Sequence, residues 1–175
     1  MIFKDLRQAI IDKISLEIPD LQAVDPHPGQ FNLNELKRIT TLLPAVRVAV
    51  LNTQTISLVG NGEKDIPLQL AAYVVTEDGT SPKDESAMEY VEALLELIPE
   101  QRWGMPRVTD ARNIQAQNMF TAEADIYGVA MWSVTWEQSI RTGTDVNLGG
   151  TTPSEVYLCG DSDNFGNEPA YDRVA

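Results

Sequence analysis

The sequence predicts an α+β fold in which two helices cover one face of a mostly antiparallel sheet, forming a two-layer sandwich with an extended C-terminal arm. Two segments carry apolar side chains at helical spacing, whereas several others alternate apolar and polar residues with the period of two typical of strands. Alternating strands favour an antiparallel sheet with one covered face. The pattern predicts one domain over residues 1–142 and a polar arm over residues 143–175.

Two long helices are expected to form the covering layer of this sandwich. The first spans residues 2–17, with apolar side chains at positions 2, 3, 6, 9, 10 and 14, and the second spans residues 84–98. A shorter helix is expected over residues 32–43. It ends before Pro44, because a proline disfavours the helical backbone in the residue that precedes it. The long helices are the expected cover for the apolar face of the sheet.

The strands are expected on either side of the second long helix. Alternating and β-branched runs predict them at residues 21–24, 45–51, 54–60, 65–76, 112–127 and 128–140. The glycine-rich turn GNGEKD leads into the fourth of these segments. The order of the main elements is therefore helix, short helix, three strands, long helix and one or two closing strands.

The closing strand, GVAMWSVTWEQSI, separates into two faces when it is read with a period of two. One face is apolar and is expected to lie beneath the helices, with both tryptophans in the core: Ala130, Trp132, Val134, Trp136 and Ile140. The other face is polar: Ser133, Thr135, Glu137 and Ser139. This polar face is expected either to meet solvent or to contact a partner, so its residues are candidates for an interface.

The charge of the chain limits the partners it can hold. Thirteen basic and 26 acidic residues give a formal net charge of −13 and a pI near 4.3. Tight binding of DNA or of an anionic membrane rests on Lys and Arg, so both are disfavoured as partners. With a single cysteine and no long apolar run, we expect a soluble cytoplasmic protein without an internal disulfide.

Catalytic and metal-binding residues are scarce in the sequence. His27 is the only histidine and lies between two prolines, so it is interpreted as a surface loop residue. Cys159 lies in the acidic segment VYLCGDSD, which disfavours the thiolate that a nucleophile needs. The sequence therefore predicts no enzyme activity, no metal site and no cofactor.

The second long helix carries four glutamates along one face, Glu85, Glu89, Glu92 and Glu96. No lysine lies at the positions four residues on that would pair with them, so the carboxylates repel one another slightly. The stripe is either a solvated helix face or an acidic wall that faces a basic partner or passing DNA.

The segment QRWGMPR is a second candidate surface. It combines residue types that are enriched at the centres of protein interfaces: Arg102, Trp103, Met105 and Arg107. These side chains form either an interface or a loop whose tryptophan packs on its own domain.

Three short motifs occur in a fixed order along residues 1–143: PGQF at 28–31, LPAV at 43–46, and W-x-V-x-W at 132–136. In this order the chain resembles a conserved tail protein family of Mu-like contractile-tail phages, which is similar to tail terminators. The resemblance does not extend over the arm.

The resemblance implies a structural virion protein without cofactor or reaction. Such a subunit forms a hexameric ring at the head-proximal end of the tail, stops polymerisation of the tube and sheath proteins, and joins the neck or connector protein. DNA passes through its lumen without specific binding, so the acidic stripe becomes a candidate lumen face. The resemblance likewise makes the polar face of the closing strand and the segment QRWGMPR candidates for a subunit or tube interface. No membrane is involved.

The arm has one apolar island, SEVYLC, whose strand candidates are Val156, Tyr157 and Leu158. We expect it to add a strand to a neighbouring subunit and to become ordered on assembly. Three other functions remain open: a head–tail connector subunit, a small ligand-binding domain that uses Trp103 and the PHPG loop, and a hydrolase that uses carboxylates.

Overall fold

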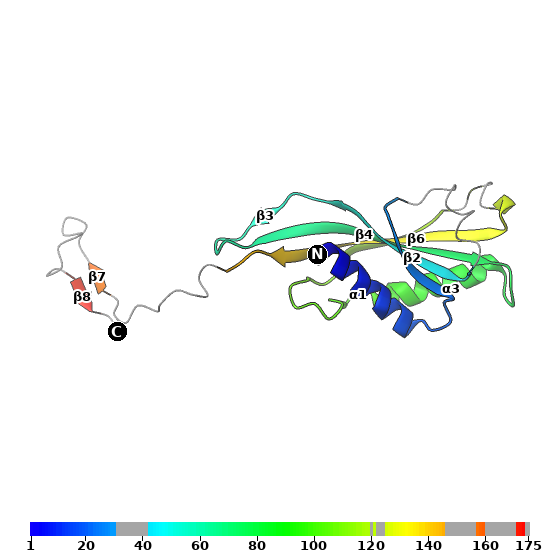
Figure 1. Ribbon diagram of the computed structural model, residues 1–175, viewed down its shortest axis with the longest axis horizontal. Coiled ribbons are helices and arrows are strands. Elements are labelled where there is room, and N and C mark those ends of the chain that lie inside the picture. The colour runs from blue at the N-terminus through cyan, green and yellow to red at the C-terminus, as the bar shows by residue number, and fades with distance from the viewer. Residues whose placement is uncertain (31–41, 120, 122–124, 146–156, 160–170, 174–175) are drawn as a thin grey trace.

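The computed structural model describes residues 1–30, 42–119, 121, 125–145, 157–159 and 171–173. Within them two helices pack on one face of a six-stranded mixed sheet, so the predicted α+β fold is confirmed (Figure 1). The expected helix at 32–43 lies almost entirely outside the described residues; residues 42 and 43, which are described, are not helical.

The sheet has the strand order β1–β2–β4–β6–β5, and β3 pairs with the start of β4. Its strands are β1 (Ala23–His27), β2 (Ala45–Thr53), β3 (Ser57–Leu58), β4 (Lys64–Glu77), β5 (Arg112–Asn118) and β6 (Val129–Thr142). Only β1 and β2 run parallel; the other pairs are antiparallel. The ladder between β4 and β6 runs without a register shift over their 14 residues.

Helix α1 (Ile2–Glu17) and helix α3 (Lys83–Leu97) lie on the same face of the sheet (Figure 1). The apolar spacing of three and four residues turns one stripe of each helix toward the strands. Helix α1 packs against β1 and β2, whereas α3 packs against β4 and β6. The core between them consists of buried side chains from both layers, including Leu6, Ile10, Leu70, Leu94 and Trp136.

The opposite face of the sheet is also buried over part of its area, which the sequence did not lead us to expect. A second apolar cluster covers the end of β4 near Glu77 and the start of β6, and it contains Leu43, Ala45, Ala49, Ala71, Tyr73, Val75, Val129 and Met131. Unbroken apolar runs such as LAAYVV are typical of strands that are buried on both faces. The face is therefore not uniformly polar.

The prediction that His27 is a surface loop residue is wrong. His27 ends strand β1, is only 4% exposed, and presents its ring edge to Tyr73 at a centroid distance of 5.6 Å. Its Nδ1 lies 2.7 Å from the carbonyl oxygen of Gly29. The flanking prolines favour an extended backbone in the residues that precede them, and an edge strand tolerates Pro26 because one of its sides needs no N–H donors.

The chain leaves the sheet at Gly143, directly after β6. Its φ is +107°, and a Cβ atom there would lie 3.1 Å from both Glu63 Cα and the Gly62 carbonyl oxygen. A side chain at this position would be strained by the positive φ and crowded against the backbone. Further along, β7 (Tyr157–Cys159) and β8 (Tyr171–Arg173) pair antiparallel in a sheet of their own.

Candidate functional site

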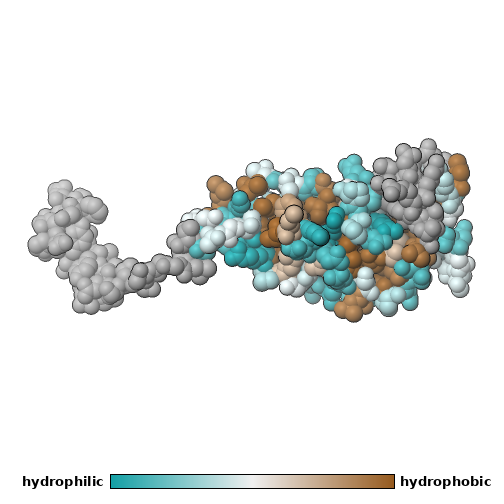
Figure 2. Space-filling model, in the orientation of Figure 1, coloured by the Kyte–Doolittle hydropathy of each residue, from teal (hydrophilic) through white to brown (hydrophobic). Residues whose placement is uncertain are grey.

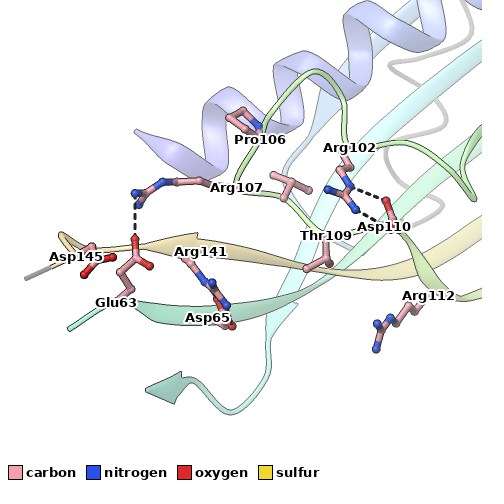
Figure 3. Close-up of a pocket in the computed structure, with 11 residues that line it drawn as sticks. Glu63, Asp65, Arg102, Pro106, Arg107, Thr109, Asp110, Arg112, Arg141 and Asp145 are labelled. Atoms are coloured by element: carbon pink, nitrogen blue, oxygen red, sulfur yellow. Dashed lines mark hydrogen bonds and ion pairs between the residues drawn. The ribbon is translucent and has the colours of Figure 1, made fainter. Parts of the chain in front are cut away.

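A charged hollow of about 530 Å³ lies where the loop of residues 99–111 meets the start of β4 and the end of β6 (Figure 3). Four of the chain's eight arginines line it together with four acidic residues. The lining is Glu63, Asp65, Arg102, Pro106, Arg107, Val108, Thr109, Asp110, Arg112, Arg141 and Asp145.

Two of these arginines form bidentate ion pairs. Arg102 donates from Nε to Asp110 Oδ1 at 2.7 Å and from Nη2 to Oδ2 at 3.0 Å. Arg141 makes the same two-pronged contact with Asp65, with both distances at 2.8 Å. Such fork-to-fork geometry fixes the orientation of both groups more firmly than a single contact does.

A third arginine joins the loop to the strand ends. Arg107 Nη2 lies 3.0 Å from Glu63 Oε1, and Arg107 Nη1 donates to the Gly143 carbonyl oxygen at 3.1 Å. The Glu63 side chain is only 7% exposed, so this pair is better shielded from water than the other two. Arg107 therefore ties the loop to both strands at one end of the β4–β6 ladder, where β4 begins and β6 ends.

Arg112, at the start of β5, differs from the other three. It is exposed, and it makes no ion pair with any residue that the structure describes. Figure 3 shows its side chain apart from the three ion pairs. It is thus the arginine of the hollow that is most available to an external carboxylate.

The hydrogen bonds from arginine lower the pKa of two carboxyl groups in the hollow. Hydrogen bonding from Arg141 lowers the pKa of Asp65, and hydrogen bonding from Arg102 lowers the pKa of Asp110. A lowered folded-state pKa means that the contribution to stability is present above the ordinary carboxyl pKa and is lost as the pH falls through the lowered value.

Asp65→Asn is therefore expected to lower the urea midpoint slightly at about pH 7, and this difference from the wild type should shrink as the pH falls below about 4. Urea unfolding at a series of pH values measures it. Asp12→Asn is the matched control, since exposed Asp12 accepts a hydrogen bond from Gln8 rather than from an arginine. A difference for Asp65→Asn that grows toward acid pH would contradict the assignment.

The loop that carries this hollow is held to the sheet by a side chain that the sequence did not single out. Gln138 is 2% exposed and uses all of its hydrogen-bonding capacity. Its Oε1 accepts from the indole N–H of Trp103 at 2.7 Å and of Trp136 at 2.9 Å. Its Nε2 donates to the carbonyl oxygens of Gln101 at 2.9 Å and Thr109 at 2.8 Å.

The candidate surface at residues 102–107 consists of two buried or partly buried side chains and two exposed ones. Trp103 is 5% exposed, and its ring packs against Trp136 in the core with a centroid distance of 6.2 Å and a tilt of 43°, so it is not available for an interface or for a ligand. Met105 is partly buried against the same core. Arg102 and Arg107 remain exposed and line the hollow.

The polar face of β6 likewise combines a buried residue with partly exposed ones. Ser133 is 7% exposed and lies in the half of the strand that is buried on both faces. Thr135, Glu137 and Ser139 are partly exposed. Glu137 accepts hydrogen bonds from Gln54, which directly follows β2, at 2.7 Å and from Asn113 of the neighbouring strand β5 at 2.8 Å.

The glutamate stripe of α3 is exposed along its whole length. Glu85, Glu89, Glu92 and Glu96 all lie on the solvent side, and none makes an ion pair with a described residue. Met88 of the same helix is 45% exposed. The predicted geometry of four carboxylates on one open helix face is present.

The arm candidates lie only partly within the described residues. Tyr157 and Leu158 belong to β7, where they pair with Arg173 and Asp172 of β8. Val156 lies outside the described residues. The expected extended backbone is present at two of the three positions, and its partner strand comes from the same chain.

No protein-family model and no curated protein matches this chain.

Most of the side chains that line the hollow are charged. Among the described residues there is no group of three or more histidine, cysteine, aspartate or glutamate side chains placed to hold a metal ion. No helix in the described part is long and apolar enough to cross a membrane. The sequence identified Arg102 and Arg107 but not Glu63, Asp65 and Arg141, because only the β4–β6 register brings those strand ends to the loop.

Proposed function

We propose that this chain is a tail terminator of a contractile phage tail. It assembles into a ring of about six copies at the head-proximal end of the tail, stops growth of the tube and sheath, and joins the tail to the neck. The ring size and the tail position rest on the order of the PGQF, LPAV and W-x-V-x-W motifs along the chain.

The observation that carries the proposal is the open glutamate face of α3. Four exposed carboxylates without cationic partners among the described residues are a cost to a monomer, since like charges at helical spacing repel. Around a channel, the same charges keep phosphates from adhering, so DNA passes without being retained. The net charge of −13 favours the same behaviour.

The remaining surface supports assembly rather than tight binding of a small molecule. The tryptophan that a ligand site would have used is buried and hydrogen-bonded to Gln138. The exposed ion pairs instead line the charged hollow at the strand ends. Polar and charged side chains that remain accessible to water are typical of the border of a protein interface.

The test combines a mass with a functional measurement. Purified protein is expected to contain a species of about six times the 19.4 kDa chain mass, and to shorten the tubes formed by the tube protein of the same virus. Tube protein alone is the control, and electron microscopy measures tube length. A strict monomer that leaves tube length unchanged would overturn the proposal, and a ring that binds the neck protein but not tubes would assign the chain to the connector instead.

A further inference from the structure

The two ends of the long β4–β6 ladder differ in the residues that surround them. The hairpin end comprises residues 54–65, 101–112 and 138–145, and includes β3 and the charged hollow. The turn end comprises residues 76–85 and 125–130, where α3 begins and β6 starts. With 14 residues in each strand, the ends lie about 45 Å apart along the ladder.

Each end exposes large apolar side chains. At the hairpin end Leu58 is 85% exposed and Ile56 is 49% exposed. At the turn end Ile126 is 80% exposed and Tyr127 is 40% exposed. Figure 2 shows apolar surface at both extremes of the body. Paired apolar patches that stand out from a polar surface are typical of contact sites.

The two ends also differ in charge. The hairpin end carries five basic side chains against four acidic ones: Lys64, Arg102, Arg107, Arg112 and Arg141 against Glu63, Asp65, Asp110 and Asp145. The turn end carries one basic side chain against five acidic ones: Lys83 against Glu77, Asp78, Asp84, Glu85 and Asp125. In a chain of net charge −13, the hairpin end is thus the less negative one.

We infer that the hairpin end of one copy docks on the turn end of the next copy. Leu58 and Ile56 would meet the apolar surface at Ile126, while Arg112, which has no ion-pair partner among the described residues, would approach the acidic rim. Two turn ends would repel each other, so the charge distribution favours head-to-tail contact over a symmetric dimer. The inference rests on the proposed self-assembly and names its surface.

Head-to-tail contact is the arrangement that a ring requires. When the two faces of a contact lie on different parts of the subunit, each added copy presents a free end, and the assembly closes into a ring or grows into a filament. The apolar side chains at the two ends supply affinity, whereas the opposite charges orient the two copies and speed their encounter.

Single charge substitutions test the two ends separately. Leu58→Asp and Ile126→Asp are each expected to weaken self-association at least about tenfold, measured by light scattering over a concentration series. Leu16→Asp is the matched control, since Leu16 is 72% exposed on α1 and belongs to neither end. It is expected to associate like the wild type, and all three positions are exposed enough for the fold to be retained.

Mixing the two end variants gives the decisive measurement. A mixture of Leu58→Asp and Ile126→Asp still contains one intact hairpin end and one intact turn end, on different chains. At a concentration where each variant alone remains monomeric, the mixture is therefore expected to form a dimer by native mass spectrometry and nothing larger.

Three outcomes would overturn the contact: wild-type association by either variant alone, failure of the mixture to form dimers, or a wild-type chain that is monomeric at every concentration. The proposed function is judged separately by tube length. Wild-type rings that cap tubes, together with a Leu58→Asp variant that also forms rings, would reject this contact and leave the tail terminator proposal in place.

Discussion

Replacing Gln138 with leucine is expected to lower the free energy of unfolding by about 3–5 kcal/mol, a large effect for a substitution that preserves volume. Leucine removes the acceptor of two indole N–H groups and the donor to two backbone carbonyls. The indoles of Trp103 and Trp136 are buried, so their N–H groups would be left without a partner. The cost comes mainly from these orphaned groups rather than from the glutamine itself.

Urea unfolding monitored by tryptophan fluorescence measures this change. Gln115→Leu is the matched control, because Gln115 is exposed on the neighbouring strand β5 and its replacement is expected to stay within about 0.5 kcal/mol. A Gln138→Leu variant as stable as the control would show that the loop is held by other contacts.

The same substitution is expected to loosen the charged hollow. Gln138 fixes the loop at Gln101, Trp103 and Thr109, and this loop carries Arg102 and Arg107. Faster proteolytic cleavage within residues 99–111 would report that loosening.

Trp136→Ala is expected to lower the free energy of unfolding by about 3–5 kcal/mol, because Trp136 is 1% exposed and lies at the centre of the core between sheet and helices. Trp132 lies on the same strand face but is only partly buried. Trp132→Ala is therefore expected to cost less, about 1–3 kcal/mol.

Comparing the two variants in one urea series separates core position from residue type. Both substitutions remove the same side chain from the same strand, so each serves as a control for the other. Equal losses would contradict the assignment of Trp136 as the more deeply packed residue.

The pattern of apolar residues predicted the layered fold well. The stripe at residues 2–17 coincides with α1, and the stripe at 84–98 lies one residue from α3. Each of these helices buries one side against the sheet, so the spacing of its apolar residues is enough to predict the helix. The strand predicted at 112–127 is shorter, since β5 ends at Asn118, and residues 125 and 126 are helical.

The features that the sequence did not reveal depend on contacts between distant segments. Trp103 could have been an interface residue or a core residue, and its burial follows from a hydrogen bond to Gln138, 35 positions later. Gln138 is a single polar residue on the apolar face of β6. Nothing in the neighbouring sequence indicates its four hydrogen-bond partners. A signal for the second buried face was present, however, in the unbroken apolar run from Leu70 to Val75.

The backbone at Gly143 limits which residues can replace this glycine. Its φ of +107° is one that L side chains rarely adopt, and an added Cβ atom would lie 3.1 Å from Glu63 Cα and from the Gly62 carbonyl oxygen. The carbonyl oxygen of Gly143 also accepts the hydrogen bond from Arg107. A substitution here would therefore strain the backbone at the end of β6 and, with it, an anchor of the loop that carries the charged hollow.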